Sequence, residues 1–192
     1  MKKIFFLFTL LLFLTGCGTE MARNQGDPQN PLPPAESEVK EGDFIYRLYT
    51  EKDVYDTFGD TAIFAELTYV GDQEEINIAH AASPFYFPME ERTRGLEIGF
   101  AMSEPLIFTN LKKGEPLRHI YQFAGGYSDQ DDPEYVQFVK SIIANKGFPE
   151  GEYIIHGTAD FTVADGPDDD IQSLPRFVLS TDIGFRVTDP VK

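Results

Sequence analysis

The sequence predicts an all-β fold, an antiparallel β-sandwich that carries one helical insertion near residues 132–146. Three observations support this prediction. Apolar and polar residues alternate along many short segments from residue 43 onward, turns with glycine separate these segments, and one segment alone has the apolar spacing of a helix. Alternation with period two is typical of strands that bury one face, and many short strands of this kind are typical of a sandwich.

The strands are predicted from this alternation. In the segment that begins at Tyr153, the side chains of Ile155 and Phe161 share a face with Tyr153, while His156 and Asp160 belong to the other face. Such a strand would pack one face in the core and leave the other in water. The same reading predicts strands at residues 44–49, 61–70, 76–80, 96–102, 117–123, 153–163 and 177–187.

The helical insertion has a start signal of its own. Asp132 is suited to cap a helix, Pro133 to occupy its first position, and Glu134 to place an acid in its first turn. Gly147 is a suitable stop. The apolar stripe between these signals consists of Tyr135, Val136, Phe138, Val139, Ile142 and Ile143.

The first residues have the pattern of an export signal. Lys2 and Lys3 precede the apolar run of residues 4–14, which is too short for a membrane span of about 20 residues. The run ends in Leu14-Thr15-Gly16-Cys17, which resembles the lipobox of bacterial lipoproteins. The resemblance implies cleavage before Cys17 and a diacylglycerol on its thiol. The alternative is an ordinary secretory signal with an incidental cysteine.

These signals divide the chain into three parts. Residues 1–16 are predicted to be a lipoprotein signal peptide, residues 17–42 the lipidated Cys17 and a disordered tether rich in proline, and residues 43–190 the β-sandwich domain. Cys17 is the only cysteine, so we expect no disulfide in the domain. The expected location is the extracytoplasmic face of the cell membrane, where the lipid anchors the protein.

The charge of the chain is strongly negative. The formal net charge is −16, and loss of Lys2 and Lys3 with the signal lowers it to about −18. Nucleic acid is therefore not expected as a partner, because its binding rests on Lys and Arg at the phosphates. An acidic domain is also repelled by anionic headgroups. We expect the lipid anchor to be the contact with the membrane, and an envelope protein is a possible further partner.

Two segments that lead from a turn into a strand read Leu111-Lys112-Lys113-Gly114-Glu115 and Gly151-Glu152-Tyr153-Ile154-Ile155-His156-Gly157. Their pairing resembles the framework of the domains in the Bacillus intracellular proteinase inhibitor family. The resemblance covers roughly residues 43–187 and implies an Ig-like antiparallel β-sandwich. The export signal and the helical insertion depart from that family, so no inhibitory residue is carried over.

Catalytic motifs are missing from the sequence. It contains no Gly-x-Ser-x-Gly elbow, no His-Glu-x-x-His motif and no glycine-rich phosphate loop, so we expect neither an enzyme nor a cofactor. His80, His119 and His156 fall on three different predicted strands. Three imidazoles could share a zinc ion, and the alternative is three separate histidines at the surface.

Two other segments contain candidate binding residues. Asp165, Asp168, Asp169 and Asp170 form an acidic loop between two predicted strands. Its oxygens could hold calcium, although the spacing is not that of an EF-hand, and the alternative is a solvated turn.

The second segment contains Phe85, Tyr86 and Phe87 between Pro84 and Pro88. If exposed, these rings would form a recognition patch. The alternative is an edge strand whose rings close one end of the sandwich, because proline argues against a central strand.

The expected function is that of a membrane-anchored lipoprotein with a non-catalytic binding or accessory domain. Two alternatives remain open at this stage. The family resemblance suggests an extracytoplasmic protease inhibitor, and the acidic loop suggests a calcium-dependent binding module.

Overall fold

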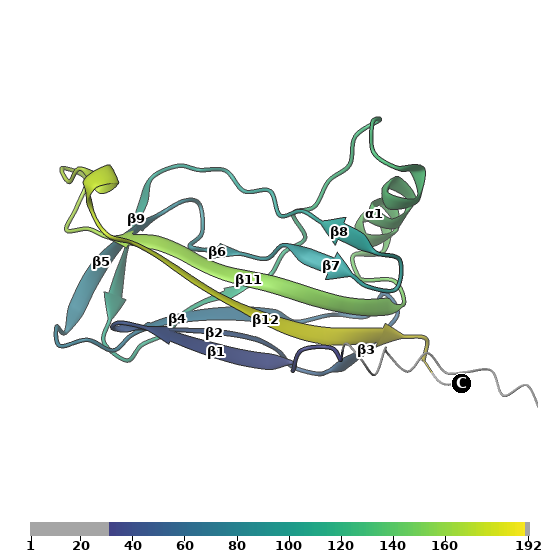
Figure 1. Ribbon diagram of the computed structural model, residues 1–192, viewed down its shortest axis with the longest axis horizontal. Helices are drawn as coiled ribbons and strands as arrows, with labels where there is room; N and C mark the ends of the chain where they lie inside the picture. The colour runs from purple at the N-terminus through teal and green to yellow at the C-terminus, as the bar shows by residue number, and fades with distance from the viewer. Residues whose placement is uncertain (1–30, 191–192) are drawn as a thin grey trace, which may run out of the picture.

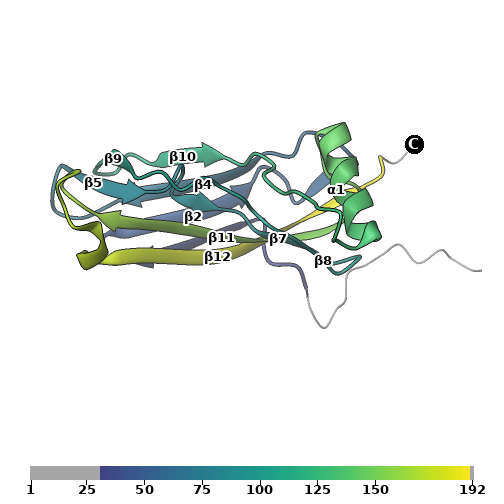
Figure 2. The same ribbon diagram turned by 90° about the horizontal axis from the view of Figure 1, so that it is seen from above.

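The computed structural model describes residues 31–190, in which two β-sheets pack face to face and a helix lies at one end (Figures 1 and 2). The four-stranded sheet contains, in spatial order, β1 (Glu36–Glu41), β2 (Phe44–Thr50), β4 (Ile63–Tyr69) and β10 (Leu117–Ile120). The central path of the eight-stranded sheet is β3 (Val54–Asp56), β12 (Arg176–Thr188), β11 (Gly151–Val163), β5 (Glu75–His80) and β9 (Ile107–Lys112). The structure confirms the predicted sandwich with one helical insertion.

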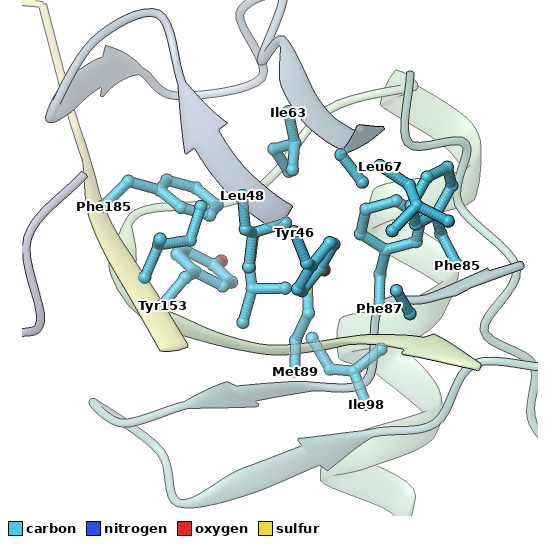
Figure 3. Packing of buried hydrophobic residues seen from close by; sticks show 14 of the residues in the cluster. Tyr46, Leu48, Ile63, Leu67, Phe85, Phe87, Met89, Ile98, Tyr153 and Phe185 are labelled. Carbon is cyan, nitrogen blue, oxygen red and sulfur yellow. The ribbon is translucent and has the colours of Figure 1, made fainter. Parts of the chain in front are cut away.

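The core lies between the two sheets and is formed by the inward residues of the alternating strands. Tyr46 and Leu48 of β2 are fully buried, while Arg47 between them faces outward. Tyr153 and Phe185, from the paired strands β11 and β12, stack with ring centroids 5.1 Å apart (Figure 3). Aromatic rings bury large areas each, so they can fill the space between the sheets without a disulfide.

One edge of β11 pairs with three short strands in succession, which are β5, β6 (Phe85–Tyr86) and β7 (Met89–Glu91). Two prolines interrupt this series. The carbonyls of Pro84 and Pro88 still face β11, where they accept hydrogen bonds from the N–H groups of Asp160 and His156. Another residue at either position would also donate its N–H to β11, and proline cannot, so the pairing with β11 is interrupted there. Strand β8 (Leu96–Ile98) then pairs with β7.

The helix α1 (Pro133–Asn145) begins as predicted, with the Asp132 carboxylate accepting a hydrogen bond from the N–H of Glu134. Its end differs in detail. The left-handed residue is Lys146, with φ of 55°, rather than Gly147. The helix is fixed to the sheet through Arg94, whose guanidinium lies 5.6 Å from the Phe138 ring and 3.1 Å from the buried carboxylate of Glu91.

Three predicted boundaries were wrong. Residues 36–41, assigned to a disordered tether, form β1 and pair with β2 along its length. The strands predicted to reach residues 102 and 123 end at Ile98 and Ile120. The segment that follows each of these two strands leaves the sheet, and the two segments meet where the Ala101 N–H donates to the carbonyl of Ala124.

The pairing between strands is antiparallel except between β3 and β12, which run parallel. The described chain begins beside β12, where the carbonyl of Pro34 accepts a hydrogen bond from Gly184 N–H at 3.1 Å. Residues 31–35 therefore lie in the same half of the long axis as α1 (Figures 1 and 2). Within residues 31–190, no helix has the length and the apolar character needed to cross a membrane.

Candidate functional site

An apolar groove of about 600 Å³ runs beside the C-terminal half of α1. The helix contributes Ile142 and Ile143, and the segment after β10 contributes Tyr121 and Phe123. Phe148, just after the helix, also lines it and stacks on Tyr121 with a centroid distance of 6.2 Å. The volume lies in the range of small-molecule sites, which are concave and mostly apolar.

The walls of this groove belong partly to the core and partly to the surface. Phe148 is buried and packs against Tyr153 at 5.0 Å, so it fixes the floor of the groove to the centre of the sandwich. Ile143 is 51% exposed, although it belongs to the apolar stripe of α1. The stripe is thus wider than its contact with the core, and the excess faces water at the groove.

A strained loop holds one side of the groove. Phe58 has a φ of 56°, which is uncommon for any residue with a side chain and more so for a bulky one. Its N–H donates to the carbonyl of Phe148 at 2.8 Å, and Gly147 packs so closely that an added Cβ would lie 2.8 Å from the Phe58 backbone. This contact explains why a glycine stands at position 147. The side chain of Phe58 itself is exposed.

Few polar groups line the groove. They are Thr61, Gln122 and Lys146, together with the hydroxyl of Tyr121. Burial raises the pKa of the Tyr121 hydroxyl above its ordinary value, so this group stays neutral. Lys146 is exposed at the end of the helix, where a cation is favourable. The groove therefore offers apolar contact with one cation at its mouth.

A second hollow, a polar cleft of about 550 Å³, lies over the outer face of the eight-stranded sheet. Two of its charged groups bond to each other. Arg176 of β12 pairs through two nitrogens with the carboxylate of Asp160 on β11, and Nε lies 2.6 Å from Oδ1. Tyr86 lies beside this pair, and burial together with the charges of Asp160 and Glu104 raises its pKa.

The three histidines do not share a site. His80 lines the polar cleft and bonds through Nε2 to the Thr109 hydroxyl at 2.7 Å. His119 lies 2.8 Å from the Ser83 hydroxyl, and His156 pairs with Asp182 on the outer face. Over residues 31–190, no three His, Cys, Asp or Glu side chains gather in a way that could hold a metal ion. The three histidines therefore lie apart and do not form the shared zinc site that the sequence left open as an alternative.

The acidic loop is held by local hydrogen bonds. The carboxylate of Asp169 accepts from the N–H groups of Asp165 and Gly166, at 2.6 and 3.2 Å. Asp168 and Asp170 are exposed. The four calcium candidates thus do not converge on one point, and the arrangement is that of a capped turn.

The aromatic segment is not an exposed patch. Phe85 and Phe87 are buried in the core, and only Tyr86 is half-exposed, at the polar cleft. Strand β6 pairs with β11 alone, which is the arrangement expected of an edge strand. Phe85 and Phe87 were therefore wrong as binding candidates, because alternation along this segment sends their rings inward (Figure 3).

Cys17 and the rest of the lipobox lie outside the described residues. The comparison with protein families nevertheless identifies this segment, since residues 1–17 match the prokaryotic membrane lipoprotein lipid attachment site. The match supports a bacterial lipoprotein that is attached to a membrane through lipid. Searches of curated proteins and of solved structures found no significant match to the chain. The resemblance to the proteinase inhibitor family is therefore without support from relatives.

Sequence reasoning missed the groove. Its lining comes from residues 61, 121–125 and 142–148, which are far apart in the chain. Ile143 offered the one local signal. An apolar stripe that includes both Ile142 and Ile143 spans a wide arc of a helix, so a narrow contact with the core leaves part of it exposed.

Proposed function

We propose that this chain is an extracytoplasmic lipoprotein whose domain is a non-catalytic binding module, with the groove beside α1 as its binding site. The observation that carries this proposal is the exposed apolar wall of the groove, centred on Ile143. Contact of apolar surface with water is unfavourable in free energy, and this surface is removed from water when another apolar group packs against it. An apolar concavity with few polar groups is the usual form of a ligand site.

A binding role is also supported by the way in which the polar side chains are used. Asp160 is paired with Arg176, His80 with Thr109, and His156 with Asp182. The hydroxyl of Ser83 lies near His119, but it also accepts a hydrogen bond from the N–H of Phe85 and so stabilises a turn. In the described part of the chain no carboxylate bonds to His119. These groups serve structure, and none of them faces the groove.

The location rests on Cys17. The match to a lipid attachment site at residues 1–17 supports an acylated cysteine at the start of the processed chain, and two acyl chains suffice for stable attachment. Cys17→Ser should release the protein from the membrane fraction and leave the domain folded, because Cys17 precedes the residues that form the two sheets. Fractionation and thermal melting measure both outcomes. A Cys17→Ser protein that remained in the membrane would contradict the anchor.

The groove itself is tested by photo-crosslinking in native membranes. A photoreactive amino acid replaces Ile143 in one version of the full lipoprotein and Val178 in the other. These two side chains are 51% and 49% exposed, and Val178 lies on the outer face of β12. We expect a defined adduct from position 143 and only background from position 178. Equal adducts from both positions would overturn the groove as the binding site.

A further inference from the structure

The occupant of the groove can be inferred from its chemistry and its position, and the inference rests on the proposed binding function. We propose that the groove receives an acyl chain of a phospholipid from the bilayer that holds the anchor. The domain would then contact the membrane twice, through the lipid on Cys17 and through this groove.

The first argument is reach. Between Cys17 and Pro31 the chain has 14 residue steps, which can span at most about 46–50 Å. The described chain begins in the half of the molecule that carries α1, since Pro34 bonds to Gly184 near the end of β12. Residue 151 pairs with residue 187 in that same region, and the groove residue Phe148 lies three residues before residue 151. The groove therefore lies at the end of the domain to which the anchored segment connects, within reach of the bilayer.

The second argument is apolar surface. Ile143 is 51% exposed on the wall of the groove, and the apolar residues Tyr121, Phe123 and Phe148 line the groove with it. The groove therefore presents a mostly apolar lining to whatever lies outside it. A bilayer interior is the apolar phase that is always present beside an anchored protein.

The third argument concerns charge. The acidic domain is repelled by anionic headgroups, and the exposed carboxylates of Asp56 and Asp60, close to Phe58 in the chain, add to this charge. Adsorption through headgroup charge is therefore disfavoured. Capture of an acyl chain needs no anionic lipid, and Lys146 at the mouth can lie near one phosphate. The lipid is thus recognised by its acyl chain and not by its headgroup, and binding should persist in zwitterionic membranes.

The strained loop fits the same role. Phe58 is held at positive φ by its hydrogen bond to Phe148 and by the close packing of Gly147. Backbone strain of this kind persists only where the surroundings enforce it, and it is frequent at ligand sites. Here it holds the backbone of Phe58 against Gly147, which lines the groove, and so fixes the shape of this wall.

The test uses the processed lipoprotein in vesicles of phosphatidylcholine that contain a small fraction of the same lipid with a photoreactive acyl chain. After illumination, peptides are analysed by mass spectrometry. We expect lipid adducts on residues 121–125 and 142–148. Ile143→Ser should lower their yield about fivefold, because it removes apolar contact from the groove wall. Val178→Ser is the matched control and should leave the yield unchanged.

A repeat with phosphatidylglycerol added to the vesicles should give the same yield at the groove. Thermal melting of both variants, which change exposed residues, verifies that the fold is retained. Adducts spread evenly over the domain, no adduct at the groove, or a yield that requires the anionic lipid would each overturn the acyl-chain proposal.

The photoreactive residue at position 143 separates this proposal from the function on which it rests. An adduct with phospholipid supports both. An adduct with another protein, or with the diacylglycerol on Cys17 of the same chain, overturns the phospholipid as occupant and leaves the groove as a binding site. Background adducts alone, equal to those from position 178, overturn both.

Discussion

The groove beside α1 and the polar cleft over the eight-stranded sheet are similar in size, at about 600 and 550 Å³, but their walls differ in chemistry. In the cleft, the charged groups of Arg176 and Asp160 bond to each other. In the groove, the lining is mostly apolar and Ile143 is half-exposed. The comparison teaches that size alone does not distinguish the two hollows, whereas the chemistry of their walls does.

The same contrast extends to the outer face of the four-stranded sheet. Glu66 accepts Arg118 Nε at 2.8 Å, Tyr49 Oη at 3.0 Å and Arg47 Nη1 at 3.3 Å. Arg118 and Arg47 also lie over the Tyr49 ring. These charged and aromatic side chains pair with one another. In this respect the outer face of the four-stranded sheet resembles the polar cleft rather than the groove.

The largest expected effect separates the floor of the groove from the ion pair of the cleft. Phe148→Ala should lower the free energy of unfolding by about 3–5 kcal/mol, because it leaves a cavity among Tyr121, Tyr153 and Phe185. Arg176→Ala should cost less than about 1 kcal/mol, because the Arg176 side chain is 66% exposed. Urea unfolding measures both. Similar losses for the two variants would break the comparison.

A smaller loss is expected where the groove meets the loop of Phe58. Gly147→Ala would bring a methyl group to 2.8 Å from the Phe58 backbone, and this backbone cannot give way as a flexible side chain could. We expect a loss of about 1–3 kcal/mol, together with a change in the groove. Gly166→Ala in the acidic loop is the control, since an added Cβ there meets nothing within 4 Å. If both variants unfolded at the same urea concentration, the close contact would not be a constraint.

The cleft, unlike the groove, should respond to mild acid through His80. Burial lowers the pKa of the His80 imidazole, and the nearby His119 acts in the same direction. The unfolded chain therefore binds a proton more readily than the folded one, so stability is present above the ordinary value of 6.5 and falls as the pH drops through it toward the lowered pKa. Melting temperatures measured through this range should fall less steeply for His80→Gln. An unchanged slope would assign the pH dependence to other groups.

The smallest effect is expected at the acidic loop beside the cleft. Its carboxylates do not converge, and Asp169 is engaged with backbone N–H groups. Addition of calcium should therefore leave the melting temperature where it is, because an ion that binds the folded state would raise it. A clear rise with calcium would restore the calcium-dependent module as a function and would make this loop a second site.

The sandwich could be predicted from the sequence because its signals are local. Tyr153 and Ile155 alternate with His156 along β11, and Asp132 with Pro133 starts the helix as in many proteins. Strand β1 was missed for an equally local reason. It is an edge strand in which Val39 is the only large apolar residue, so alternation gives almost no signal.

The sites could be predicted less well. Phe85 and Phe87 have the composition of a recognition patch, and only their register on β11 shows that they point into the core. The groove forms where α1 packs beside the segment after β10 and the loop of Phe58. These segments are far apart in the sequence, and the fold alone brings them together, so no local sequence pattern predicts the groove.

The central claim is that the wall at Ile143 is covered by another molecule in the membrane-bound protein. Because Cys17 is the only cysteine and lies in the lipid attachment site, Ile143→Cys and Val178→Cys should each introduce a single free thiol into the acylated protein. The two positions are equally exposed in the domain alone. In native membranes, we predict that a thiol at position 143 reacts with a water-soluble maleimide far more slowly than one at position 178, and that detergent removes the difference. Equal rates in the membrane would contradict the claim.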